Sequence, residues 1–83
     1  MNKVLVKLYV PILEEIYDVW LPSQQKIYNV ICLLVKAINE LNDEIYGLVD
    51  MPMLYDKFTA EPFDLDLTIK DSTIRSGAEL ILI

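Results

Sequence analysis

The sequence has no histidine, one cysteine (Cys32) and two glycines among its 83 residues. Without histidine, Ser-His-Asp and Cys-His catalysis are excluded in their usual forms, and zinc would find only carboxylates and one thiol as ligands. A single cysteine cannot form a disulfide within the chain or hold an iron–sulfur cluster, which needs four thiolates. We therefore expect a protein that is not an enzyme and carries no metal or cofactor. The sequence assigns no role to Cys32.

Basic residues are also scarce, with seven Lys and Arg against 13 Asp and Glu and a net charge of −6. They are scattered, so no basic stripe exists to neutralise the phosphates of nucleic acid or of anionic lipid. The longest apolar run, residues 30–35, is far shorter than the roughly 20 residues that span a bilayer. The chain also begins without the layout of a signal peptide. We expect a cytoplasmic protein that neither binds nucleic acid nor inserts directly into a membrane.

Apolar residues are abundant, at 54% of the chain, which predicts one ordered domain over residues 1–83. The most conspicuous stretch is 23–41, where apolar residues recur at helical spacing. Ser23 is the expected N-cap, and Asn42 can take the left-handed conformation that ends a helix. The stripe expected to face the core is Ile27, Val30, Ile31, Leu34, Ile38 and Leu41.

Before this helix, residues 3–10 and 15–21 alternate between apolar and polar side chains, as in strands, and the turn 11–14 joins them. If paired residues have numbers that sum to 25, Lys7 lies opposite Asp18, Leu5 opposite Trp20, and core residues opposite one another. A slip of one residue would bury Asp18 and Trp20. Proline cannot continue a strand ladder, so Pro22 is expected to lie between strand and helix.

The rest of the chain predicts shorter elements. Residues 42–51 form an irregular connection with the apolar plugs Ile45, Leu48 and Val49. Short strands are expected at 53–55 and 63–65. In the loop 68–76, Asp71 and Ser72 cap a single helical turn, and Ile69 and Ile74 reach into the core. The last strand, 77–83, is apolar on both faces, which is typical of a central strand.

This order of elements predicts an α+β fold. A final strand beside the first would run parallel to it, through a long crossover. The result is a mixed four- to five-stranded sheet with one long helix packed on one face, which is a β-grasp fold.

Over its whole length the chain resembles ubiquitin-like β-grasp proteins. The residues that carry this resemblance are Leu21-Pro22-Ser23, the helical Ile27, Asn29-Val30 and Ile31, and Thr68-Ile69-x4-Ile74-x2-Gly77-x2-Leu80-Ile81-Leu82. Within that group it is most similar to the YukD/EsaB proteins of type VII (WXG100) secretion in Gram-positive bacteria. This similarity lies in Tyr17-Asp18-Val19, in Tyr55-Asp56-Lys57-x-Thr59 and in Ile74-Arg75-x-Gly77-x-Glu79-Leu80-Ile81-Leu82-Ile83. The resemblance implies a non-catalytic, cytoplasmic accessory or regulatory component of the secretion machinery.

The sequence also argues against three other chemistries. A ubiquitin-type modifier or sulfur carrier needs a flexible Gly-Gly tail, whereas this chain ends at Ile83 within its last strand. Asp64, Asp66 and Thr68 match the D-x-D-x-T signature of aspartate-based phosphatases, but too little chain follows for that much larger domain. Alternation along a solvated edge strand, with Leu65 and Leu67 inward, explains the same spacing. A calcium loop lacks its glycine, and Arg75 stands where a glutamate is required.

If the alternation is correct, Leu5, Trp20, Ile81 and Ile83 form an apolar cluster on the sheet face away from the helix. Such a cluster is expected to be covered by a protein partner, for example a membrane component or ATPase of the secretion system. A homodimer, or cover by residues 48–53, are the alternatives. On the helix, Tyr28, Cys32 and Val35 form a second ridge; Tyr28 and Val35 are expected to flank the core. A general ubiquitin-like adaptor or self-assembling subunit unrelated to secretion remains the second functional hypothesis.

Overall fold

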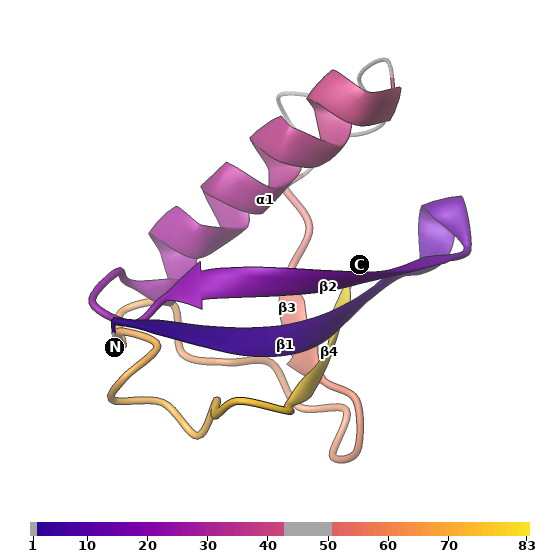
Figure 1. The fold of residues 1–83 in the computed structure, drawn as a ribbon. Coiled ribbons are helices and arrows are strands. Elements are labelled where there is room, and N and C mark those ends of the chain that lie inside the picture. Colours follow the sequence, from indigo (N-terminus) through magenta and orange to yellow (C-terminus); the bar gives the residue numbers. More distant parts are fainter. Residues whose placement is uncertain (1, 43–50) are drawn as a thin grey trace.

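The computed structural model describes residues 2–42 and 51–83. Its elements are β1 (Lys3–Val10), the 3-10 turn η1 (Pro11–Leu13), β2 (Glu15–Pro22), α1 (Ile27–Asn42), β3 (Leu54–Asp56) and β4 (Glu79–Leu82). The strands form a four-stranded sheet in the order β2-β1-β4-β3, in which β4 is parallel to β1 and antiparallel to β3. Helix α1 crosses one face of this sheet diagonally (Figure 1). The predicted β-grasp fold and its central last strand are therefore confirmed.

The hairpin has the predicted register. Lys7 pairs with Asp18, Leu5 with Trp20 and Val6 with Val19. The expectation that Pro22 stops the ladder is wrong, because β2 includes Pro22, which pairs with Lys3. Proline is tolerated there because it lies at the end of an edge strand, where no further strand requires its missing N–H.

The start of α1 differs from the prediction. The helix begins at Ile27, and Ser23 does not cap it. Instead, the N–H of Ile27 donates to the carbonyl of Leu67 (2.8 Å), and the N–H of Tyr28 donates to that of Leu65 (3.2 Å). Two of the N–H groups that a helix leaves unpaired in its first turn are thus satisfied by backbone carbonyls from the loop after β3. At the other end Asn42 is still helical, and its side-chain amide donates to the Ile38 carbonyl (3.0 Å).

The core lies between α1 and the sheet. All predicted stripe residues are buried except Leu41, which is 74% exposed. Figure 1 shows why, since the last turns of α1 rise away from the sheet. Ile69 and Ile74 are fully buried, as predicted for plugs from the long loop. Leu80 and Leu82 of β4 are buried beneath the helix as well.

The predicted strand at 63–65 is wrong. Pro62 makes only an isolated bridge with Tyr55, and turns follow it. The Asp64 carboxylate accepts the N–H of Asp66 (2.9 Å). This contact forms an Asx turn, so the segment is a turn and not an edge strand. Leu67, expected to face inward, is 38% exposed.

The loop 68–76 contains the predicted single helical turn, because the N–H groups of Asp71 (3.2 Å) and Ser72 (3.1 Å) both donate to the Thr68 carbonyl. Thr68 has the role predicted for Asp71, because its hydroxyl accepts the N–H of Asp71 (3.1 Å). The predicted plugs Ile45, Leu48 and Val49 lie outside the described residues.

Candidate interaction face of the sheet

The open sheet face is the face turned away from α1. Because side chains alternate along each strand, the register places Leu5, Trp20 and Ile81 on it, and Ile83 follows Ile81 by two residues. Trp20 is 53% exposed and Ile83 63% exposed, whereas Leu5 and Ile81 are half-buried by their neighbours. The four residues of the predicted cluster therefore share one face.

They do not form one patch, because the register arranges this face in rows that run across the strands. One row, the apolar row, contains Ile16 of β2, Tyr9 of β1, Ile81 of β4 and Tyr55 of β3. Ile16 is 62% exposed, and the other three are half-buried. Such cross-strand pairs of aromatic and β-branched side chains stabilise a sheet. Ile81 belongs to this row.

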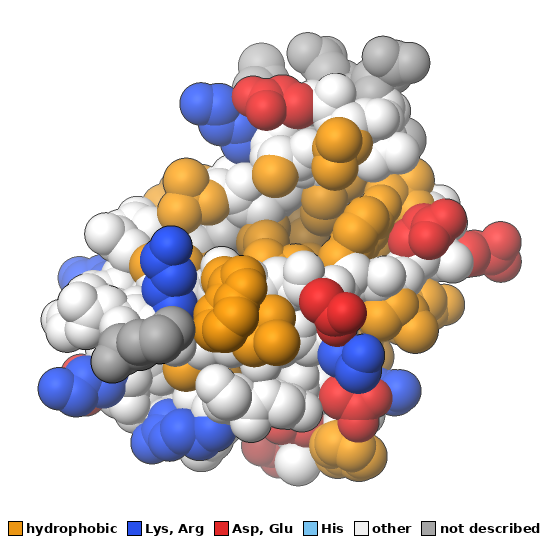
Figure 2. Space-filling view, in the orientation of Figure 1, with side chains coloured by type: hydrophobic (Ala, Val, Ile, Leu, Met, Phe, Trp, Pro, Cys, Tyr) orange, Lys and Arg blue, Asp and Glu red, His pale blue; other side chains and the backbone are white. Residues whose placement is uncertain are grey.

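The next row, the ionic row, carries charges of alternating sign. In order across the sheet it contains Asp18, Lys7, Glu79 and Lys57, one from each strand or the residue directly after it. Lys7 Nζ lies 3.2 Å from Asp18 Oδ1, and Lys57 Nζ lies 3.4 Å from Glu79 Oε1. Figure 2 shows acidic and basic side chains following one another down the sheet, with hydrophobic groups on both sides. These ion pairs are exposed and contribute little to folding stability individually.

Leu5 and Trp20 lie beyond the ionic row. The N–H of Leu5 donates to the hydroxyl of Ser76 (3.4 Å), and the carbonyl of Leu5 accepts the N–H of Gly77 (2.8 Å). Gly77 has φ +92°, a backbone conformation that favours glycine. Leu5 and Trp20 are thus held as a pair next to a tight turn, and the ionic row separates them from Ile81.

Ile83 lies on the far side of the apolar row. Its N–H donates to the carbonyl of Met53 (3.0 Å) and its carbonyl accepts the N–H of Met53 (2.7 Å), which continues the β3–β4 ladder by one pair. The sequence prediction missed Ile16, Tyr9 and Tyr55 as members of this surface. The alternation of side chains in β1 and β2 is sufficient to predict Ile16 and Tyr9 on the open sheet face. Predicting Tyr55 there requires the β3–β4 register, which the sequence does not provide.

The helix side also carries apolar groups, and an apolar groove of about 150 Å³ lies between α1 and the β1–β2 hairpin, lined by Leu8, Tyr17, Asp18, Val19, Leu34, Ala37, Ile38 and Leu41. Val35 packs against the core as predicted, but Tyr28 is 51% exposed, so the expectation that it flanks the core is wrong. Leu33 is 54% exposed on α1. Cys32 is partly buried and its thiol is free.

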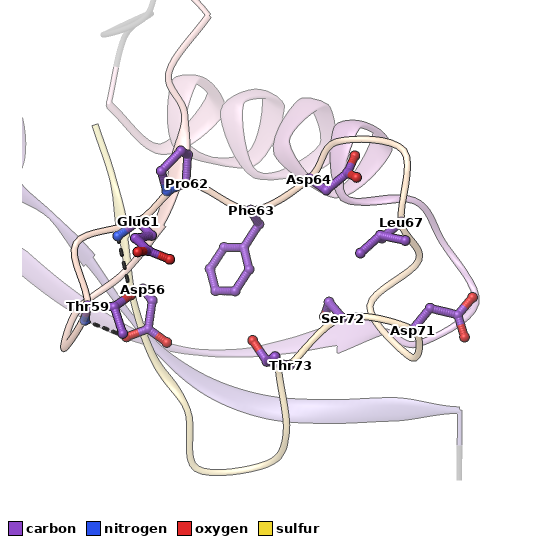
Figure 3. A pocket seen from close by; sticks show the side chains of 10 residues that line it. All are labelled: Asp56, Thr59, Glu61, Pro62, Phe63, Asp64, Leu67, Asp71, Ser72 and Thr73. Atoms are coloured by element: carbon purple, nitrogen blue, oxygen red, sulfur yellow. Dashed lines mark hydrogen bonds between the residues drawn. The ribbon is translucent and has the colours of Figure 1, made fainter.

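A cavity of about 310 Å³ lies outside the sheet, between the turns that follow β3 and those that follow residue 62. Figure 3 shows the ring of Phe63 at its centre. Its lining includes four acids and no basic residue: Asp56, Glu61, Asp64 and Asp71. Such a site repels phosphate.

Two of the four acids of this cavity, Asp56 and Asp64, close turns with their side chains. Asp56 accepts the N–H groups of Phe58 (2.8 Å) and Thr59 (3.2 Å), and Asp64 closes its own turn. Asp66, the second acid of the D-x-D-x-T match, does not line the cavity. The phosphatase geometry is therefore not assembled. Among residues 2–42 and 51–83, no three His, Cys, Asp or Glu side chains are placed to hold a metal ion. Within the same ranges, no helix has the length and hydrophobicity needed to cross a membrane.

No protein-family model matches the sequence, and no curated protein sequence matches it either. Solved structures do. The ubiquitin-like domain of EccD5 from Mycobacterium xenopi is 18% identical with a TM-score of 0.78, over 100% of this chain and 94% of that one. The ubiquitin-like domain of the Mycobacterium tuberculosis type VII secretion protein EccD1 is 18% identical with a TM-score of 0.74, over 100% and 99%.

A chain of the MycP5-free ESX-5 inner membrane complex is 13% identical with a TM-score of 0.79, and this sequence spans 21% of its length. The same fold also matches outside secretion, in a chain of a toluene 4-monooxygenase complex that is 11% identical with a TM-score of 0.73, over 96% of this chain and 95% of that one. Similarity at these identities concerns the fold, so the chain has a ubiquitin-like β-grasp fold.

Proposed function

We propose that this chain is a non-catalytic ubiquitin-like protein-interaction module, acting as an accessory or regulatory component of a Gram-positive type VII secretion system. The observation that carries the proposal is the full-length similarity to the ubiquitin-like domains of two EccD proteins. The short motifs that resemble YukD/EsaB proteins point to the same machinery. A cytoplasmic location follows from this role.

The open sheet face is the surface we assign to partner binding. Trp20 supports this assignment because it is a large aromatic side chain that the fold leaves 53% exposed. Aromatic residues are enriched among those that dominate interface energetics. Leu5 extends the contact beside it, and Ile81 and Ile83 extend it across the ionic row. The partner we propose is a protein of the secretion apparatus, either a membrane component or its ATPase.

The absence of catalysis is supported by the chemistry of the described residues. The cavity around Phe63 offers carboxylates that cap turns and no basic group to bind or activate an anionic substrate. Its serine, Ser72, is engaged, since its hydroxyl donates to the Ile69 carbonyl and accepts the N–H of Ile74.

The alternative is a ubiquitin-like adaptor or self-assembling subunit unrelated to secretion. The similarity to a chain of a toluene 4-monooxygenase complex supports this alternative, because that chain has the same fold in a complex that is not a secretion system.

Secretion measured in the organism of origin decides between the two functions. The gene is deleted and replaced by the wild type, by Trp20→Ala or by the matched control Leu33→Ala, whose side chain is equally exposed on α1. We expect export of WXG100 proteins to fail in the deletion strain and with Trp20→Ala, and to persist with Leu33→Ala. Equal thermal melting of both purified variants shows that the fold is intact. Normal export in the deletion strain would refute a role in secretion.

A further inference from the structure

The ionic row has a symmetry that its single charges do not reveal. Across the sheet its signs run minus, plus, minus, plus, from Asp18 through Lys7 and Glu79 to Lys57. Read in the opposite direction, the signs run plus, minus, plus, minus. Suppose that a second copy packs its open face against this one, related by a two-fold axis that is parallel to the strands and passes between β1 and β4. β2 of one copy then faces β3 of the other, and β1 faces β4. Each charge of one copy then faces an opposite charge of the other.

The same rotation matches the apolar row with itself. Ile16 of one copy faces Tyr55 of the other, and Tyr9 faces Ile81. An isologous two-fold interface requires this kind of self-complementary surface, in which residue i contacts j and j contacts i. A face that carried one sign of charge would instead repel its own copy.

We propose that the open sheet face docks a second copy of this chain, face to face, through the ionic and apolar rows. In the dimer Asp18 faces Lys57 of the other copy, and Lys7 faces Glu79. Each lysine then lies between carboxylates of both copies. The inference rests on the proposed function, since that function assigns this face to protein contacts.

The dimer is expected to be weak. With strands about 4.8 Å apart and successive rows about 6.8 Å apart, four strands and the two rows cover about 260 Å² per copy. Stable interfaces bury about 800 Å² per partner, so we expect a dissociation constant on the order of 100 μM. Such a dimer exchanges readily, which leaves the face available to a tighter-binding partner. Self-association and partner binding then compete.

The test uses a variant in which the whole row is inverted: Asp18→Lys, Lys7→Glu, Glu79→Lys and Lys57→Glu. Both ion pairs within the chain are retained with reversed signs, and the inverted row is again self-complementary. A mixed pair is not, because every charge would face a like charge. We therefore expect wild type and inverted variant each to self-associate, and not to associate with one another.

The readout is the amide spectrum of dilute ¹⁵N-labelled wild type titrated with unlabelled protein. Unlabelled wild type is expected to shift signals of β1 and β4, with weaker shifts when salt is raised from about 50 mM to about 500 mM. Unlabelled inverted variant is expected to shift none of them. Labelled inverted variant titrated with its own unlabelled form is the control for its folding and self-association.

Wild type that stays monomeric up to about 1 mM, or equal shifts with both titrants, would overturn the dimer. If the inverted variant does not fold, the single change Lys7→Glu at an exposed position provides the second test, and it should abolish the wild-type shifts. Neither outcome alters the secretion experiment with Trp20→Ala, so failure of the dimer and failure of the proposed function are distinguishable.

Discussion

Replacing Ser72 by alanine tests how the long loop is held against the core. Ser72 is 6% exposed and lies between the plugs Ile69 and Ile74, which are 0% and 1% exposed. Its hydroxyl donates to the Ile69 carbonyl at 2.7 Å and accepts the Ile74 N–H at 3.1 Å. Alanine fills almost the same space, so the variant removes two hydrogen bonds with little change in packing.

The expected cost follows from those two bonds. A buried neutral hydrogen bond contributes about 0.5–1.5 kcal/mol net, so losing both destabilises the protein by about 1–3 kcal/mol. The Ile74 N–H loses its acceptor in a segment that is nearly closed to water, which favours the upper part of this range. For a domain of this size the melting temperature should fall by about 5–20 °C.

Urea unfolding followed by circular dichroism measures this cost directly. Ser76→Ala is the matched control, because Ser76 is exposed and its hydroxyl accepts only a long hydrogen bond, from the Leu5 N–H at 3.4 Å. We expect the control to lose less than about 0.5 kcal/mol. If Ser72→Ala loses no more than Ser76→Ala, the hydroxyl does not hold the two plugs and the reasoning is refuted.

Two further changes test the core and the hairpin. Ile31→Ala should cost about 2–5 kcal/mol, because Ile31 is 1% exposed at the centre of the helical stripe, whereas Leu33→Ala should leave urea unfolding nearly unchanged; equal losses would contradict the placement of α1. Glu14 has φ 53°, a left-handed conformation that strains residues other than glycine, so Glu14→Gly should raise the free energy of unfolding by about 0.5–1 kcal/mol in the same assay, and a loss would show that this strain is absent.

The hairpin and the core stripe could be predicted from the sequence because their information is local. Alternation in both strands and the opposite charges of Lys7 and Asp18 leave one register that buries the apolar set. The stripe Ile27 to Ile38 follows from helical spacing in the same way. The central position of β4 followed from its two apolar faces.

The predictions from sequence fail where a structural element is completed by contacts with residues far away in the chain. Ser23 is a good N-cap by composition, but α1 begins at Ile27 because the carbonyls of Leu65 and Leu67 accept its first N–H groups. Local pattern cannot reveal that contact. The division of the open face by the ionic row has the same origin, since it depends on Glu79 lying beside Lys7 across a long crossover.

The alternation of Asp64, Asp66 and Thr68 has a different explanation. It resembles a strand, but Asp64 closes a turn with its own side chain, and this local hydrogen bond competes with sheet pairing. Short acidic runs of this kind fit either structure.

The central claim is that the open sheet face binds a protein of the secretion apparatus. Site-specific photo-crosslinking in the organism of origin tests it most directly, with a photoreactive amino acid in place of Trp20 and, as control, in place of Leu33 on α1. The account predicts that the position of Trp20 links to a membrane component or ATPase of a type VII secretion system and that the position of Leu33 does not. Linkage to such a protein from Leu33 alone, or from neither position, would contradict it.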